Sequence, residues 1–317
     1  MASLAEQRLK LDTKKEQHLV RHLPIVLSIA ALALLAVVPT VSADKPQRIV
    51  SLNLCTDQLL MMLAEPQRIA ALSYLAQDEG SSVMYEEARK FRVTHAQAEE
   101  IFVLEPDLVL VGTFNAASTV AILKRLGKRV EQFSPAQSFA DIRVNLQRLG
   151  DLLGEREKAD ALIREFDLEL ERVRREQLTR KPRAAFYYSN NYTAGDATLA
   201  NEILQASGMR NIGAELGLSQ TTKLPLELLV MANPELIIRD RDFGPPARAQ
   251  EVFEHPALAF LQGRSNQTQV ADKFMICGAP FTINAVKRLV AARKQIERAK
   301  AAQLEANPQT DVVAAAQ

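Results

Sequence analysis

The sequence predicts an α/β protein with two lobes, each built on a mostly parallel sheet, and one long α-helix between them. Short apolar runs alternate with helical patterns over residues 48–133 and again over residues 183–303, which is typical of parallel sheets covered by helices. Residues 138–178 separate the two blocks and carry almost no strand signal. A helix, a proline, an acidic residue and a buried strand follow one another in residues 99–110, and the same order returns in residues 227–238. This repeated order favours two related lobes over one continuous sheet.

The first 43 residues have the composition of an export signal. A basic region precedes an uncharged run of fourteen residues from Ile25 to Val38, and the small-residue sequence VSA then ends at Ala43. A transmembrane anchor is the alternative, but it needs about 20 apolar residues, so this run is too short to cross a bilayer. We therefore expect cleavage after Ala43 and export to an oxidising compartment, the periplasm of a Gram-negative cell.

The first lobe is expected over residues 44–154. Its strands are predicted where apolar and branched residues run together, and its helices where apolar residues recur every three or four positions. Thr56 is expected to cap the first helix, and Gly127 is expected to end the third. The predicted strands are 48–54, 68–74, 107–112 and 128–133, and the predicted helices are 56–64, 98–104, 117–127 and 138–154.

A connecting helix and a second lobe are expected to follow. Apolar residues between Ala159 and Val173 recur at helical steps, so residues 155–180 are predicted to form the connector. The second lobe is expected over residues 181–300 with Asp196 as the cap of its first helix, and residues 301–317 are expected to form a disordered tail. The predicted strands are 183–189, 235–240 and 267–274, and the predicted helices are 196–208, one starting near Pro225, and 282–303.

Composition excludes several classes of function. The net charge of +1 provides no general attraction for nucleic acid. Two cysteines are too few for a disulfide scaffold or a four-thiolate zinc site. Two of the four histidines, His18 and His22, lie in the export signal, while His95 fits a helix cap as well as a ligand and His255 fits a surface helix. We therefore expect no metal site and no cofactor belonging to the protein itself.

Several segments resemble a known family when they are taken in order. They are the export signal, RIVSLNLCTDQLL at 48–60, AEEIFVLEPDLVLVG at 98–112, NEILQASGMRNIG at 201–213 and LPLELLVMANPELII at 224–238. Together with the long helix, they resemble the substrate-binding proteins of ABC importers for cobalamin, ferric siderophores and haem. The resemblance covers residues 47–297. It implies Rossmann-like lobes, a ligand cleft between them and no catalytic residues.

The candidate ligand-binding residues follow the predicted strands, because open α/β sheets bind ligands outside the carboxyl ends of their strands. Tyr187, Tyr188 and Tyr192 cluster at and just after the end of one predicted strand, and tyrosines suit a macrocyclic or aryl ligand because they combine apolar area with a polar tip. For Tyr187, the alternative is that its side chain packs in the core of the lobe. The candidates are Asn53, Cys55, Thr56, Tyr74, Phe114 and Asn115 in the first lobe, and Tyr188, Tyr192, Arg239, Arg241, Lys273, Phe274 and Cys277 in the second.

The basic candidates have two interpretations. Arg239, Arg241 and Lys273 fit contacts to carboxylates or to an anionic ferric chelate. They equally fit a solvated loop in which Asp240 and Asp242 neutralise the arginines.

Cys55 and Cys277 have three interpretations. As the chain's two cysteines, each near the mouth of a different lobe, they form a disulfide if their Cα atoms lie within about 7 Å. They also fit two thiolates that reach a soft metal or a metal-bearing ligand. The third alternative is two small packed residues without chemistry.

The resemblance implies a periplasmic solute-binding component of an ABC transporter. Its ligand would be an iron chelate, such as a siderophore or haem, or a corrinoid such as vitamin B12, so iron or cobalt would arrive within the ligand. Its partners would be the permease and ATPase complex at the inner membrane, and we expect a monomer. The alternatives are an exported cysteine-dependent enzyme, since Cys55 precedes a helix, and a ligand-sensing or scaffold protein with the same lobes.

Overall fold

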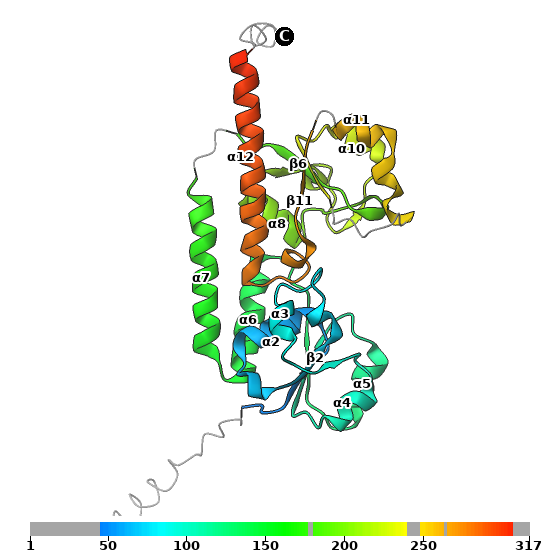
Figure 1. Ribbon diagram of the computed structural model, residues 1–317, viewed down its shortest axis with the longest axis vertical. Helices are drawn as coiled ribbons and strands as arrows, with labels where there is room; N and C mark the ends of the chain where they lie inside the picture. The colour runs from blue at the N-terminus through cyan, green and yellow to red at the C-terminus, as the bar shows by residue number, and fades with distance from the viewer. Residues whose placement is uncertain (1–44, 177–179, 240–247, 263–264, 307–317) are drawn as a thin grey trace, which may run out of the picture. The chain divides into compact units, whose positions relative to one another are not determined.

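Two parallel sheets organise the computed structural model, which describes residues 45–176, 180–239, 248–262 and 265–306 (Figure 1). The predicted α/β architecture with mostly parallel sheets is confirmed. The first sheet has the order β3-β2-β1-β4-β5 and all of its strand pairs are parallel. Its strands are β1 (Ile49–Ser51), β2 (Ile69–Ser73), β3 (Val93–Thr94), β4 (Leu108–Gly112) and β5 (Val130–Phe133).

The helices of the first lobe follow its strands, as the alternating pattern predicts. The prediction that Thr56 caps the first helix is wrong, because Asn53 caps it and accepts the Cys55 backbone N–H. Gly127 adopts a positive φ of 72° just after α5, the conformation expected of a residue that ends a helix. The helices are α2 (Leu54–Leu63), α3 (Tyr85–Ala88), α4 (Ala98–Val103) and α5 (Ala117–Arg125), with 3₁₀ turns η1 (Pro66–Arg68) and η2 (Tyr74–Gln77).

Two helices lead from the first sheet to the second. α6 (Phe139–Leu153) begins at Ser138, whose side chain accepts the Asp141 N–H, and ends at Gly154 with a φ of 69°. α7 (Arg156–Arg174) is the predicted connector, and it ends before the predicted residue 180. The lobe boundaries at residues 154 and 180 stay a prediction. Buried residues of α6 and α7 share one core with residues of both sheets, so packing does not divide the chain there.

The second sheet has the order β11-β10-β6-β8 and is also parallel, with a short antiparallel pair β7–β9 beside it. Its strands are β6 (Arg183–Phe186), β7 (Tyr192–Thr193), β8 (Arg210–Asn211), β9 (Thr222–Lys223), β10 (Leu236–Arg239) and β11 (Asn266–Gln269). Its helices are α8 (Leu199–Ala206), α9 (Ile212–Glu215), α10 (Leu226–Ala232), α11 (Pro256–Gln262) and α12 (Ile283–Ala306), with 3₁₀ turns η3 (Ser189–Asn191), η4 (Arg248–Glu254), η5 (Asp272–Phe274) and η6 (Pro280–Thr282).

Two expectations for the second lobe are corrected. Asp196 does not cap α8, because the Thr198 side chain accepts the Asn201 backbone N–H instead. The expected disordered tail begins too early, since α12 continues to Ala306 through alanine, lysine, glutamine and leucine, which all favour helices. Residues 307–317 lie outside the described residues.

One apolar core joins the two sheets. It contains Ile49 and Leu108 from the first sheet and Ala184 and Leu236 from the second, together with the buried faces of α6, α7 and α12. Phe166 of α7 is 2% exposed within this core. The connector is therefore packed against both lobes along its length.

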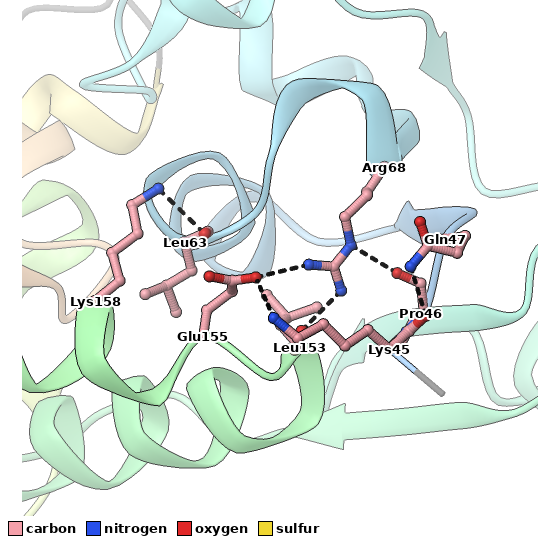
Figure 2. A network of polar contacts seen from close by, with 8 residues as sticks. All are labelled: Lys45, Pro46, Gln47, Leu63, Arg68, Leu153, Glu155 and Lys158. Atoms are coloured by element: carbon pink, nitrogen blue, oxygen red, sulfur yellow. Dashed lines mark hydrogen bonds and ion pairs between the residues drawn. The ribbon is translucent and has the colours of Figure 1, made fainter. Parts of the chain in front are cut away.

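Charged contacts fix α7 at both of its ends. Figure 2 shows the first end, where the buried Arg68 donates to the Pro46 and Leu153 carbonyls and pairs with Glu155 at 3.0 Å. Lys45 also pairs with Glu155, and Lys158 donates to the Leu63 carbonyl. These contacts hold the start of α7 on the first lobe. Ion pairs also join the second end to α12, which runs beside α7 in Figure 1: Lys287 with Glu169, Arg293 with Glu176 and Lys294 with Glu176.

Candidate functional site

A cavity of about 310 Å³ lies at the carboxyl edge of the first sheet. The segments after β1, β4 and β5 form most of its wall, and Ile276 and Gly278 of the second lobe complete it. The order of the strands reverses between β1 and β4. From β1 the chain adds β2 and β3 on one side, and it then returns to add β4 and β5 on the other side of β1. Parallel α/β sheets bind ligands at such a reversal. Among the predicted candidates, Asn53, Cys55, Thr56 and Phe114 line this cavity.

Two asparagines hold the loops around the cavity. Asn53 Oδ1 accepts the Cys55 N–H at 3.0 Å and so starts α2 beside the cavity. Asn115 Oδ1 accepts the Gly112 N–H, and its Nδ2 donates to the Leu52 carbonyl at 2.8 Å. A Cβ on Gly112 would lie 2.6 Å from Asn53 Nδ2, so only glycine permits this close approach. Both predicted candidates therefore use these side-chain atoms to shape the site.

A buried polar network joins α2 to the end of β2. The fully buried Asp57 carboxyl accepts the Ser73 backbone N–H at 3.2 Å and also contacts the Ser73 hydroxyl. Thr56 is buried as well, and its hydroxyl lies 2.7 Å from Ser51 Oγ. Burial raises the pKa of Asp57 to about 7, while hydrogen bonds from Ser51 and Ser73 act in the opposite direction. Because Ser73 precedes Tyr74, this network also helps to position Tyr74 at the end of β2.

Cys55 and Cys277 form a disulfide that joins the two lobes. Their Cα atoms lie 5.0 Å apart although 222 positions separate them in the sequence. Cys55 lines the cavity, whereas Cys277 is buried. In this structure neither sulfur is a free nucleophile or a free metal ligand, so Cys55 lacks the thiolate that an enzyme mechanism would need.

Exposed aromatic and apolar side chains line the cavity or stand at the same carboxyl edge of the sheet. Phe114 is 86% exposed and Ile276 is 51% exposed. Tyr74 stacks on His95 with ring centroids 5.2 Å apart. Tyr74 follows β2 and His95 follows β3, so the stacked pair lies at the same carboxyl edge of the sheet. These four side chains are together named the rim; Phe114 and Ile276 offer apolar contact, and Tyr74 and His95 combine a ring face with a polar atom.

The tyrosines of the second lobe divide between core and surface. Tyr187 is fully buried, as its core alternative predicts, and burial raises its pKa to about 12. Tyr188 is half-buried and stacks on Phe186 with ring centroids 5.6 Å apart. Tyr192 is 39% exposed, and its carbonyl accepts the Tyr188 N–H at 2.8 Å. Tyr188 and Tyr192 stand after β6, at the carboxyl edge of the second sheet.

The structure separates Arg239 from the cavity beside Cys55. The Arg239 guanidinium carbon lies 4.0 Å from the ring centroid of Phe253, and the residue borders a second cavity of about 350 Å³ next to β11 and α12. Alternation along β10 places Arg239 on the same face as Ile237, whose core contacts include Phe253. Arg241 lies outside the described residues.

Lys273 and Phe274 hold their loop against other parts of the fold. Lys273 Nζ donates to the Glu79 carbonyl at 3.3 Å and lies 5.4 Å from the centroid of the Tyr85 ring. Phe274 is half-buried and packs against the shared core. Both residues therefore help to seat a second-lobe loop on the first lobe.

Sequence reasoning did not place Leu75 or Ile276 at the cavity. It also missed the burial of Asp57 and the stacking of His95 on Tyr74. His95 follows the two-residue strand β3, which is too short to produce a periodic signal. Leu75 and Ile276 each adjoin a predicted candidate, so extending each candidate by one residue would have found them. In the sequence, Asp57 is an acidic residue in the first turn of a predicted helix. Such residues are common on protein surfaces, so the sequence gives no indication that Asp57 is buried.

The described residues contain no cluster of three or more histidine, cysteine, aspartate or glutamate side chains arranged to hold a metal ion. A metal that arrives inside a chelate does not require such a cluster, because the chelate already supplies most of its ligands. Within the same part of the chain, no helix is both long and apolar enough to span a bilayer.

Comparison with known proteins decides the family. A model of the periplasmic binding protein family matches residues 49–263. The chain belongs to this family. Its fold agrees with the periplasmic haem-binding protein RhuT of Roseiflexus sp. RS-1, with a TM-score of 0.66 and 19% identity over 79% of this chain and 98% of that chain. The periplasmic vitamin B12 binding protein BtuF of Vibrio cholerae gives a TM-score of 0.60 and 17% identity over 80% of this chain and 98% of that chain.

The curated relatives found by sequence align over a smaller share of each chain than these structures do. A cobalamin-binding protein of Halobacterium salinarum is 23% identical over 199 residues, which are 62% of this binding protein and 54% of the relative. The uncharacterized ABC transporter substrate-binding lipoprotein YvrC of Bacillus subtilis is 26% identical over 155 residues, 45% of this chain and 48% of that one. The chain therefore spans about half the length of these curated relatives. Family membership confirms the predicted resemblance to periplasmic binding proteins.

Proposed function

We propose that this binding protein captures an iron chelate or a corrinoid in the cavity beside Cys55 and delivers it to an ABC importer. The observation that carries the proposal is the aromatic rim, in which Phe114 is 86% exposed beside the cavity. Sites for large organic ligands are mostly apolar and contain a few placed polar groups. The iron chelates in question are siderophores and haem, and the corrinoid is of the vitamin B12 type. Relatives named for haem, vitamin B12 and cobalamin binding support this ligand class.

The size of the cavity fits a ligand that extends onto the rim. Its volume of about 310 Å³ lies at the small end of the range of roughly 300–1,000 Å³ for ligand pockets. A macrocycle would therefore place one edge in the cavity and its face against Phe114 and the Tyr74–His95 stack. Phenol oxygen and imidazole nitrogen are donors that bind haem iron, so Tyr74 and His95 suit a ligand that carries its own metal. The protein itself then needs no resident cofactor.

The proposed location is the periplasm, with the leader removed after Ala43. The backbone N–H groups of Gln47 and Arg48 donate to the Asp107 carboxylate, and the Lys45–Glu155 pair lies next to them. Cleavage after Ala43 would leave all of these contacts in place. Intact mass spectrometry of the exported protein is expected to give the mass of a chain that starts at Asp44, and a retained leader would contradict this proposal.

The proposed partners are a permease and ATPase complex at the inner membrane, which a monomer of the protein would approach with ligand bound. Two observations support these partners. The chain belongs to the periplasmic binding protein family, and one sequence relative is described as an ABC transporter substrate-binding lipoprotein. Stimulation of ATP hydrolysis by the reconstituted importer, measured with loaded protein, tests the partnership.

Ligand titration of the oxidised protein tests the proposal. Haemin, cyanocobalamin and ferrichrome serve as the panel, and we expect at least one to bind with a stoichiometry of one. Phe114→Ala is expected to weaken that binding by roughly five- to thirtyfold, because it removes about 1–2 kcal/mol of aromatic contact. Phe102→Ala is the matched control, since Phe102 is 50% exposed on α4 and does not line the cavity. No binding across the panel, or equal losses in both variants, would contradict the proposal.

A further inference from the structure

We infer that the Cys55–Cys277 disulfide fixes a second-lobe loop as one wall of the ligand cavity, and that reduction by a dithiol releases this wall and the ligand. The loop comprises residues 272–278, named here the wall loop. Release of the wall is argued from contacts in this structure alone. Release of the ligand rests on the proposed function.

The wall loop closes a cavity that the first lobe otherwise builds. Ile276 and Gly278 line the cavity directly beside Cys55. Ile276 is 51% exposed, so its side chain contributes to the wall without being packed into a core. The residue between them, Cys277, is bonded to Cys55 at the start of α2. The disulfide therefore attaches the middle of this wall to the strand edge where the ligand is proposed to bind.

Phe274 and Met275 also pack the wall loop against the shared core, and its polar contacts across the lobes through Lys273 and Ile276 are long or exposed. Lys273 Nζ donates to the Glu79 carbonyl at 3.3 Å in an exposed position, and Cys55 Sγ lies 3.9 Å from the Ile276 carbonyl. An exposed hydrogen bond of this kind contributes little to stability, because water competes for both groups. Among the described residues, the disulfide is the covalent attachment of this loop to the first lobe.

The chain on the far side of Cys277 is held by packing. A Cβ on Gly278 would lie 2.4 Å from Ala136 Cβ and 3.0 Å from Ile142 Cγ1, so the backbone at Gly278 is pressed against α6 and the segment before it. Ala279 is fully buried in the shared core. Loss of the disulfide is therefore expected to loosen the turn around the exposed Ile276 and to leave α12 in place.

The reduction step balances with a dithiol as the electron donor. One thiolate of the dithiol attacks Cys55 Sγ, the partly exposed sulfur, and the S–S bond breaks with Cys277 leaving as a thiolate. The second thiolate of the dithiol then attacks the mixed disulfide, and Cys55 leaves as a thiolate. Two electrons pass to the protein, both protein thiolates take up protons, and the dithiol becomes a disulfide. The N-terminus of α2 stabilises the departing Cys55 thiolate.

Hydrogen exchange tests the wall without requiring a ligand. The Met275 and Ile276 N–H groups donate to the Asp272 carbonyl at 2.7 and 2.8 Å. Treatment with dithiothreitol is expected to speed exchange of these two amides at least tenfold, because the turn loses its anchor. Amides of Leu289 and Val290 in α12 are expected to exchange at an unchanged rate.

The matched control is Cys55→Ser/Cys277→Ser. Its Met275 and Ile276 amides are expected to exchange rapidly from the outset, with no response to dithiothreitol. Unchanged exchange of these amides in the reduced wild-type protein would overturn the inference about the wall, whatever the ligand data show.

Ligand titration separates this inference from the proposed function. For any of haemin, cyanocobalamin and ferrichrome that binds the oxidised protein, reduction followed by removal of dithiothreitol is expected to weaken binding at least tenfold. Equal affinity of the oxidised and reduced proteins would overturn the release of ligand. If no member of the panel binds either form, the proposed ligand class fails, and the amide exchange rates still decide whether the disulfide holds the wall.

Discussion

Replacement of Asp57 by asparagine is expected to remove a large pH-dependent component of the stability. The Asp57 carboxyl is fully buried, and its pKa is raised from 3.8 to about 7, mainly by burial. In the unfolded chain this group loses its proton near its ordinary pKa, whereas in the folded protein it keeps the proton up to about pH 7. Over this window the unfolded state binds fewer protons, so the free energy of unfolding falls as pH rises.

The size of this effect follows from the shift of the pKa. One pKa unit corresponds to about 1.4 kcal/mol, so a shift from 3.8 to about 7 corresponds to a loss on the order of 4 kcal/mol between those two values. The loss is complete above the folded pKa and absent below the unfolded one. Asp57→Asn introduces an uncharged amide of similar size, which does not titrate and keeps an oxygen that can accept the Ser73 N–H.

Urea denaturation followed by circular dichroism at about pH 4, 5.5 and 8 measures this directly. The difference in unfolding free energy between Asp57→Asn and the wild type is expected to move in favour of the variant by several kcal/mol as pH rises. Asp151→Asn is the control, because Asp151 is 49% exposed and its loss is expected to leave the wild-type slope unchanged. If the wild-type and Asp57→Asn values change in parallel across this range, the buried carboxyl does not titrate at a raised pKa and the reasoning is refuted.

Two further predictions concern packing and buried charge. Gly278→Ala is expected to lower the unfolding free energy by about 1–3 kcal/mol in urea, because its Cβ would lie 2.4 Å from Ala136 Cβ, and addition of Ala136→Gly is expected to recover part of this loss. A fully stable single variant would show that the contact relaxes at no cost. Arg68→Met is expected to lose about 3–5 kcal/mol, since it leaves buried carbonyls without donors, whereas the exposed Arg89→Met is expected to lose less than about 1 kcal/mol. Similar thermal melting curves for these two arginine variants would contradict the importance of burial.

The longer strands were predictable, whereas the two-residue strands β3, β7, β8 and β9 were not, because two residues give no periodic signal. Residues 108–111 are apolar and branched at every position, and they lie in β4, whose residues are all buried. Helix starts were less predictable, because Asn53 and Thr56 are both residues that cap helices. The choice depends on where each side chain points in three dimensions: Asn53 reaches the Cys55 N–H, while Thr56 is turned toward Ser51.

The candidate site was predictable only where strand order determined it. Cys55 and Phe114 follow the two adjacent central strands, so the rule about carboxyl ends placed them correctly at one cavity. The same rule selected Arg239, but alternation along β10 directs its side chain to Phe253. Residues such as Arg68 were beyond sequence reasoning, because its acceptors at Pro46 and Leu153 are distant in the chain and carry no residue-specific signal.

The arrangement of attachments between the lobes indicates which part of the protein moves when ligand enters. Hinge closure of binding proteins requires lobes that rotate about a flexible connection. Here α7 is paired with Arg68 through Glu155 at one end and with Arg293 at the other, and one continuous core passes through it. A large rotation would break buried contacts of Arg68 and Arg293, which are 5% and 3% exposed. Within the wall loop, Ile276 is 51% exposed, so adjustment to a ligand is expected to occur there, within the limits that the Cys55–Cys277 disulfide sets.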